Sequence, residues 1–441
     1  MPVVTGGAIA GSGQYTELES TQIIGVGGRI DTSGAVTLNA KGNIIMQSTD
    51  IGSQQAPVES LSVNAGESVV VLASVDSASA KGNVYGGSGS LKVSAQTPTG
   101  GLPLAGGAGF EIGQTDEKST VQRGAQWHVR DDLTVTAGSD HVAAILLEGL
   151  QANASRIALD ASNGGIHINA AQSLSKRDNK LISASFNLGG QTGSNKQTYS
   201  LNEFAADFKL DYDKLQSSTY ANARLTADTV DFNTPGELRL AGAQVHADQI
   251  NGSVGSLQAI SVKDDVDAIT VKAEAAIGKG GDPWGAIGGL ASLAGEWGNK
   301  TKQRLEQLNA TYSFPVSAKL DFELRRELRD TVAQSTVLNG RDSLGLNVAK
   351  ETLLQGAQLQ TMGNQVTPSN DRLQTSDLDS RDRLVTVSLL ARTPSLSAIK
   401  NLYSDLQKDK PEEVQIDTGL FRAGGHNRTQ HLTGGVEKLS L

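Results

Sequence analysis

Short runs in which apolar and polar residues alternate recur along the chain, separated by a few small polar residues. The clearest examples are Gly34–Ile51, Glu59–Asp76, Asp131–Ala152 and Ser155–Gln172. Alternation with a period of two is typical of a β-strand that buries one face, and Gly, Asn, Asp and Ser favour turns. Each of these segments therefore predicts a strand, a turn and a second strand.

The alternating runs return at a nearly constant spacing. Leu38 and Val63 lie 25 residues apart, and Val135 and Leu159 lie 24 residues apart. A period in the twenties is expected for a solenoid, in which one coil buries its apolar side against the next at a distance of about 4.8 Å. The whole chain would then make roughly 20 coils of about 22 residues. A β-sandwich or barrel, which also has short strands between turns, is the alternative.

A longer repeat relates two parts of the second half of the chain. The matching segments are Lys209–Tyr212 with Lys319–Phe322, Leu240–Val245 with Leu354–Leu359, Ser256–Gln258 with Arg372–Gln374, and Thr270–Val271 with Thr386–Val387. Their separation rises slowly from 110 to 116 residues. Four matches in the same order indicate a duplicated unit of several coils.

Three segments depart from the alternating pattern. Ile277–Gly298 is rich in Gly and Ala and predicts a loop, although its Trp284 and Trp297 leave a sugar-binding platform or a partner contact open. Leucines at i, i+4 spacing in Lys319–Gln334 predict an amphipathic helix. Pro394, followed by apolar residues on one helical face, predicts a second helix. Arg422–Leu441 is polar and contains glycines, which predicts a loose end.

These patterns divide the chain into five regions. We expect an N-terminal segment (1–24), a β-helix (25–275), a Gly-rich and partly helical excursion (276–335), further coils (336–392), and a helix with a loose C-terminal end (393–441).

Composition agrees with a thin stacked core. Hydrophobic residues make up 38% of the 441 residues and aromatic residues only 4%, whereas 50 glycines supply turns. The net charge of −9 argues against a nucleic-acid partner and an anionic membrane surface, and no apolar run is long enough to span a membrane. Met1–Tyr15 has no signal-peptide pattern. The absence of cysteine is either chance or an adaptation to export in an unfolded state.

The sequence assigns no metal, cofactor or catalytic residue. Zinc would need histidines at ligand spacing, and the six histidines have none: His128, His141, His167, His246, His426 and His431. The nucleotide-binding loop motif is absent, and Gly86–Ser90 resembles a calcium-binding repeat but has Ser90 where the ligand Asp would stand.

Carboxylate clusters leave one enzymatic alternative open, because some β-helices degrade polysaccharides with paired carboxylates. The clusters are Asp131/Asp132, Asp264/Asp265/Asp267 and Asp377/Asp379/Asp382. Each is placed at an expected turn, where Asp usually bonds the backbone. Exposed Trp127, Trp284 or Trp297 beside such a pair would favour the enzyme.

The segments LSVNAGESVVV, LTVTAGSDHVA, TLNAKGNIIMQS and IALDASNGGIHINAAQSLSK resemble the haemagglutinin repeats of filamentous-haemagglutinin-like exoproteins. LQGAQLQT and its copy LAGAQVHA add to the resemblance, which runs from about Gly25 to about Leu390.

The resemblance implies a right-handed parallel β-helix, all-β apart from the excursions, that is exported through an outer-membrane transporter by two-partner secretion. It implies a structural and adhesive rod at the bacterial surface, not an enzyme, with a receptor or glycan on a host or neighbouring cell as partner. The motifs of the family's secretion domain and toxin boundary are absent, so we expect an internal or C-terminal portion. The alternatives are a phage tail-spike or polysaccharide-degrading enzyme and the stalk of a contact-dependent inhibition toxin.

Overall fold

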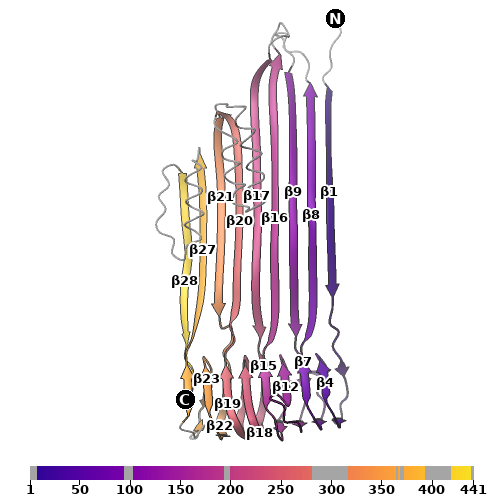
Figure 1. The fold of residues 1–441 in the computed structure, drawn as a ribbon, viewed down its shortest axis with the longest axis vertical. Helices are drawn as coiled ribbons and strands as arrows, with labels where there is room; N and C mark the ends of the chain where they lie inside the picture. Colours follow the sequence, from indigo (N-terminus) through magenta and orange to yellow (C-terminus); the bar gives the residue numbers. More distant parts are fainter. Residues whose placement is uncertain are drawn as a thin grey trace.

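Two β-sheets of different character make up the structure. The computed structural model describes residues 7–93, 103–192, 199–280, 316–363, 366–367, 372–392 and 419–438. Within these ranges every regular element is a strand. Twenty strands, most of them short, form a coiled base, and nine long strands form a flat sheet that stands on it (Figure 1).

The base is a parallel β-helix, because its short strands stack in three parallel columns. The first column contains β2 (Arg29–Ile30), β5 (Asp50–Ile51), β10 (Gln126–His128), β13 (Gln151–Asn153), the starts of β18 (Ala223–Ala241), β19 (Ala243–Ile260) and β22 (Val337–Val348), β24 (Gln358–Thr361) and β29 (Gly435–Lys438). The second contains β3 (Val36–Ala40), β6 (Leu61–Ala65), β11 (Asp132–Ala137), β14 (Arg156–Ala161), the following parts of β18, β19 and β22, and β25 (Val366–Thr367). The third contains β4 (Ile44–Gln47), β7 (Val69–Leu72), β12 (Ile145–Glu148), β15 (Ile166–Asn169), the ends of β18 and β19, β23 (Thr352–Gln355) and β26 (Leu373–Ser376).

Alternate residues of these strands fill the interior of the coils. In β6 the side chains of Leu61, Val63 and Ala65 point inward and are buried, and in β14 Ile157 and Leu159 do the same. Outward side chains make ladders along the stack: the amide of Asn64 donates to that of Asn39, 25 residues earlier, over 2.9 Å. The predicted pairings of Leu38 with Val63 and of Val135 with Leu159 are confirmed as neighbours in adjacent coils.

The long sheet has nine strands: eight are the arms of four hairpins that leave the coils, and one precedes the first coil along the chain. In sheet order they are β1 (Gly7–Ile23), β8 (Ser74–Val93), β9 (Pro103–Arg123), β16 (Ala171–Thr192), β17 (Tyr199–Ala221), β20 (Asp264–Gly280), β21 (Val316–Thr331), β27 (Leu378–Arg392) and β28 (Gly419–Leu432). All neighbours in this sheet are antiparallel. At about 3.4 Å per residue, arms of 22 and 23 residues reach about 70 Å from the base.

The hairpins follow a rule: one leaves the third column after every second coil and returns to the first column. β8/β9 follows β7, β16/β17 follows β15, β20/β21 follows β19, and β27/β28 follows β26. In the coils that lack a hairpin, the chain passes directly from the third column to the first. It makes this sharp turn through a residue with positive φ. These residues are Ser48, Gly149, Gly242 and Gly356.

The glycines at these corners also lie against the base of the next hairpin. A Cβ on Gly149 would come within 2.7 Å of the Cβ of Ala171, where β16 begins, and one on Gly356 within 2.7 Å of the Cβ of Leu378, where β27 begins. Gly242 and Gly356 occupy equivalent places in the duplicated unit inferred from the sequence. Thr270–Val271 and Thr386–Val387 likewise lie in the same cross-strand rows of the long sheet, as a duplicated unit would place them.

The structure confirms the all-β parallel helix and corrects several of its details. The first column contains nine strands, so the structure has far fewer coils than the roughly 20 expected. The sequence pattern overestimates their number because the arms have the same period-two alternation as the coils. The range 25–275, expected to be β-helix throughout, therefore also contributes arms to the long sheet.

The predicted helix over 319–334 is wrong, since β21 ends at Thr331 and is a strand. Leucines four residues apart lie on one face of a helix. They also lie on one face of a strand, because four is a multiple of the strand period of two. The expected loose end is wrong as well, because residues 419–432 and 435–438 are β28 and β29. Residues 281–298 and the second predicted helix, 394–406, lie outside the described residues.

Among the described residues, no helix is long and apolar enough to cross a membrane.

A buried histidine, His167, and a half-buried one, His246, predict that the stability of the coils depends on pH. Burial lowers the pKa of His167, against the opposing effect of Glu237, whose Oε2 lies 3.5 Å from Nε2; burial and then Arg224 lower the pKa of His246. The unfolded chain therefore takes up protons at a higher pH than the folded chain. This contribution to stability is complete above about pH 6.5 and is lost as the pH falls through the folded-state pKa values.

We expect the urea midpoint to fall between about pH 7.5 and about pH 5, and to fall less in a His167→Gln, His246→Gln variant. Titrations of both proteins across this range measure the difference. Equal slopes would assign the acid sensitivity to other groups.

Candidate functional site

The nine-stranded sheet has two chemically different faces. In β17 the side chains of Ala206, Phe208 and Leu210 are buried, whereas Asp207 and Lys209 between them are exposed. The neighbouring strands β20 and β21 continue the same alternation. Because facing residues in an antiparallel sheet share a side, the pattern defines one polar face and one apolar face.

A shallow depression runs across the polar face of the sheet, and we call it the polar trough. Two hollows of about 400 Å³ each form it and share Ser183 and Lys209. Leu181 lines it together with the polar side chains Ser12, Gln14, Ser88, Glu111, Ser183, Ser185, Asp207, Lys209, Asp211, Lys272, Glu274, Asp321 and Glu323. Strands from β1 to β21 contribute, so the trough exists only once distant segments have paired.

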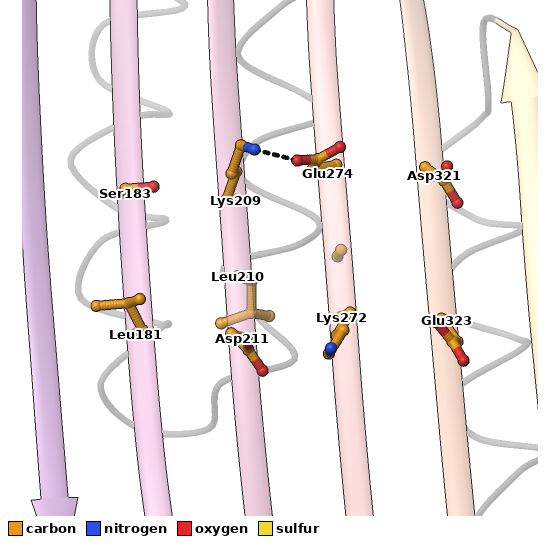
Figure 2. A pocket seen from close by; sticks show the side chains of 10 residues that line it. Leu181, Ser183, Lys209, Leu210, Asp211, Lys272, Glu274, Asp321 and Glu323 are labelled. Carbon is orange, nitrogen blue, oxygen red and sulfur yellow. Dashed lines mark ion pairs between the residues drawn. The ribbon is translucent and has the colours of Figure 1, made fainter.

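The trough is acidic, with six carboxylates and two lysines among these side chains. Lys209 lies between its row neighbours Ser183 and Glu274 and makes an ion pair with Glu274 (Figure 2). The hydrogen bond from Lys209 to Glu274 raises the pKa of the lysine. Leu210 lies behind the sheet in the same view, on the apolar face (Figure 2).

Nearer the base, the polar face carries a network of ion pairs. Arg177 contacts Glu117 at 3.1 Å and Asp213 at 3.0 Å, and the hydroxyl of Thr270 donates to Asp213 at 3.2 Å. The hydrogen bond with Asp213 raises the pKa of Arg177. These pairs link β9, β16, β17 and β20, so they hold arms from three hairpins together.

Polar side chains also close each junction between adjacent hairpins at the base. Asp76 accepts a hydrogen bond from the N–H of Gly25, and Asp264 accepts one from the N–H of Tyr220, both at 2.7 Å. Gln122 and Ser380 do the same for the N–H groups of Gln172 and Val332. These side chains accept hydrogen bonds from backbone N–H groups at points where neighbouring strands diverge. Left unpaired, the N–H groups would destabilise the fold.

The predicted carboxylate clusters do not converge on one site. Asp264 has the structural role just described, and Asp267 lies 3.9 Å from Arg326. Asp379 and Asp382 pair with His431 at 2.6 Å and His426 at 3.1 Å on the last hairpin. Asp131 and Asp132 lie at the entry to β11, in a different part of the molecule. The part of the chain that the structure describes holds no group of three or more possible metal ligands.

The aromatic residues give no support to a sugar-binding platform in the trough. Trp127 is fully buried inside the coils, while Trp284 and Trp297 lie outside the described residues. Phe110 borders the trough, but strand alternation directs its side chain to the apolar face.

Sequence reasoning missed the polar trough altogether. Each strand contributes only one to three of the trough's side chains, and nothing in their local pattern distinguishes them from other exposed strand residues. The sequence does contain one signal of where the hairpins occur, because a similar segment marks three of the corners that have no hairpin. These segments are Leu147–Ala152, Leu240–Val245 and Leu354–Leu359. The glycine of the first segment occupies the same corner as Gly242 and Gly356.

A family model described as a hemagglutinin repeat matches residues 106–273. A hemolysin of Serratia marcescens is 31% identical over 320 residues, which cover 68% of the chain and 19% of that hemolysin. A hemolysin of Proteus mirabilis is 28% identical over 291 residues, which cover 63% of the chain and 17% of that protein. The chain thus spans less than a fifth of either relative, and no solved structure matches it. The family match runs from β9 into β20, so coils and arms belong to the same repeat.

Proposed function

Because the chain belongs to the haemagglutinin-repeat family of filamentous-haemagglutinin-like exoproteins, we propose that it is a structural and adhesive segment of a large protein secreted to the bacterial surface. The coils act as a stiff base, and the long sheet presents its faces to other molecules. The chain is not an enzyme in this proposal.

One observation carries this proposal: the interior of the coils is filled with aliphatic side chains, while the largest surface stands outside them. Leu133, Val135, Ile145 and Leu147 of a single coil are all fully buried. The longest arms extend about 70 Å from that core and present exposed residues at alternate positions. A flat, extended surface suits many weak contacts, whose strengths combine when they act together.

Two features support export by two-partner secretion, through a dedicated outer-membrane transporter. The chain belongs to a family of exoproteins, and it contains no cysteine that would form loops before or during passage. Repeats that stack one on the next also allow the chain to fold progressively as it emerges.

Adhesion would use the polar trough. Its serines, Gln14 and carboxylates offer hydrogen bonds to the hydroxyl groups of a cell-surface glycan or to a polar segment of a protein receptor. The excess of carboxylates disfavours anionic ligands such as sulfated glycans. No aromatic ring from this face flanks the carboxylates of the trough among the described residues, so a polysaccharide-degrading site has less support.

A bulky residue in the trough tests the proposal. Ser185 is exposed and lines the trough, so Ser185→Trp fills it without entering the core. We expect binding of the fluorescently labelled chain to erythrocytes to weaken about tenfold, which corresponds to about 1.4 kcal/mol. The urea midpoint is expected to stay unchanged.

Ser162→Trp is the matched control, since Ser162 is exposed at a corner of the coils and far from the sheet in the chain's topology. It should bind as the unaltered chain does. Equal binding by both variants would exclude the trough as the adhesive surface, and no binding by the unaltered chain would argue against adhesion.

A further inference from the structure

The apolar face of the long sheet changes character between its two halves. Over β17, β20 and β21 its side chains are buried, including Phe208, Leu210, Val271 and Phe322. Over β1, β8 and β9, and around Phe186 of β16, the same face is more exposed, although Ile182 of β16 is buried. Six large side chains there, between 41% and 77% exposed, form what we call the apolar patch: Ile9, Tyr15, Tyr85, Leu91, Phe110 and Phe186.

Strand register brings these six residues onto one surface. Ile9 faces Leu91, and six residues further along β1 Tyr15 faces Tyr85. Phe110 faces Gly87 on one side and Ala184 on the other. The patch is therefore continuous across four strands that are as much as 177 residues apart in the sequence, counted from Ile9 to Phe186.

Four glycines make a hollow in the middle of the patch: Gly11 and Gly13 of β1 face Gly89 and Gly87 of β8. A Cβ added to Gly11, Gly13 or Gly87 would meet no atom within 4 Å, and one on Gly89 only a backbone oxygen at 3.9 Å. By contrast, a Cβ on Gly66 would come within 2.1 Å of the oxygen of Lys41. The chain's own packing therefore does not require the four glycines, although glycine weakens a strand. A partner surface that packs closely against this face of the sheet does require glycines at these positions.

From this hollow and its apolar rim, we infer that the patch is a self-association surface, on which a second copy of this chain packs its own patch face to face. A two-fold axis places the Phe110 and Tyr85 ridges of one copy over the glycine hollow of the other. Two sheets that pack by their apolar faces lie about 10 Å apart, as in β-sandwiches. Such an interface is isologous, since each copy uses the same residues.

The size of the patch suits this partner. Six large side chains, each burying about 150–250 Å² when covered and now about half exposed, offer on the order of 600 Å² per copy. That equals the largest patches of ordinary monomers, and with a polar rim it approaches the roughly 800 Å² per partner of a standard interface.

A membrane is a poorer partner for the patch than a second copy. The next two rows of the apolar face toward the base carry Glu17, Glu19, Asp116 and Asp178 against Lys81 and Lys180. Anionic lipid surfaces attract basic residues, and this rim together with the net charge of −9 opposes them.

Sedimentation velocity of the full chain over a range of concentrations tests the inference. The unaltered chain should dimerise, and Phe110→Asp and Gly87→Val should each weaken the dimer about tenfold or more. Gly87→Val is the decisive variant, because valine fits an open strand position and favours β-structure, so the monomer should keep its unfolding midpoint. Ser12→Val, on the polar face of the edge strand, is the control and should leave the dimer unchanged.

Three results would overturn the inference. The first is an unaltered chain that stays monomeric at every concentration. The second is a dimer that neither Phe110→Asp nor Gly87→Val weakens. The third is a monomer that floats with phosphatidylcholine vesicles and loses this property in Phe110→Asp, which would make the patch a lipid-binding surface. The outcome is independent of whether the trough binds cells.

Discussion

Replacing Trp127 with alanine is expected to lower the free energy of unfolding by about 3–5 kcal/mol, the range for removing a large buried aromatic side chain. Trp127 is fully buried between Ile51 and Ala152 of the adjacent coils. Its indole N–H donates to the carbonyl oxygen of Thr49 over 2.9 Å, so truncation also leaves that oxygen without its partner. Urea titration followed by circular dichroism measures the loss.

Two variants separate the contributions to this loss. Trp127→Phe keeps a ring but removes the hydrogen bond, and we expect about 1–2 kcal/mol. Ile45→Ala removes an apolar side chain that is 68% exposed on the outside of the first coil, and it should change stability by less than about 0.5 kcal/mol. A Trp127→Ala variant as stable as Ile45→Ala would mean that Trp127 is not part of the core.

Replacing Gly252 with valine is expected to destabilise the coils by about 3 kcal/mol or more, through backbone strain and overpacking. Gly252 has φ of +151°, where side chains are rarely tolerated. A Cβ there would come within 1.9 Å of the carbonyl oxygen of Phe232 in the neighbouring coil. The substitution therefore pushes apart two coils in the middle of the stack, and a lower thermal unfolding midpoint reports it.

Gly345 supplies the matched control, because it pairs with Asn251 in the same column, one residue along from the pairing of Gly252. A Cβ on Gly345 would lie 3.6 Å from the side-chain oxygen of Asn251, an ordinary contact. Gly345→Val should therefore be much less harmful. Equal damage from both substitutions would show that side-chain bulk, and not the close approach to Phe232, sets the cost.

The coils could be predicted from the sequence because the spacing of their contacts varies little. Where no hairpin intervenes, residues of adjacent coils pair 19 to 25 positions apart: Val63 pairs with Leu38 at 25 positions, and Ala243 with Ala223 at 20. The repeat is therefore visible in the chain as a period in the twenties. The family follows from the motifs that recur with this period and from the similarity to known relatives.

The hairpins could not be predicted in this way. Their arms alternate with the period of two that the coils also have, and their partners lie at separations set by hairpin length. Leu324 illustrates the difficulty. It lies four residues from the leucines on either side, which fits a helix, and only its pairing with Val271 and Val387 shows that it is a strand residue on the apolar face.

By itself the sequence determined the strands and inward residues of the coils, the approximate spacing of the coils and the family. The tertiary structure decided which alternating runs stay in the coils, which stand out as arms, and how the polar trough and the apolar patch assemble. The physical reason is that alternation specifies a strand with two unlike faces but not what lies against either face. That choice depends on pairings between arms such as β1, β8, β9 and β16, which no local pattern records.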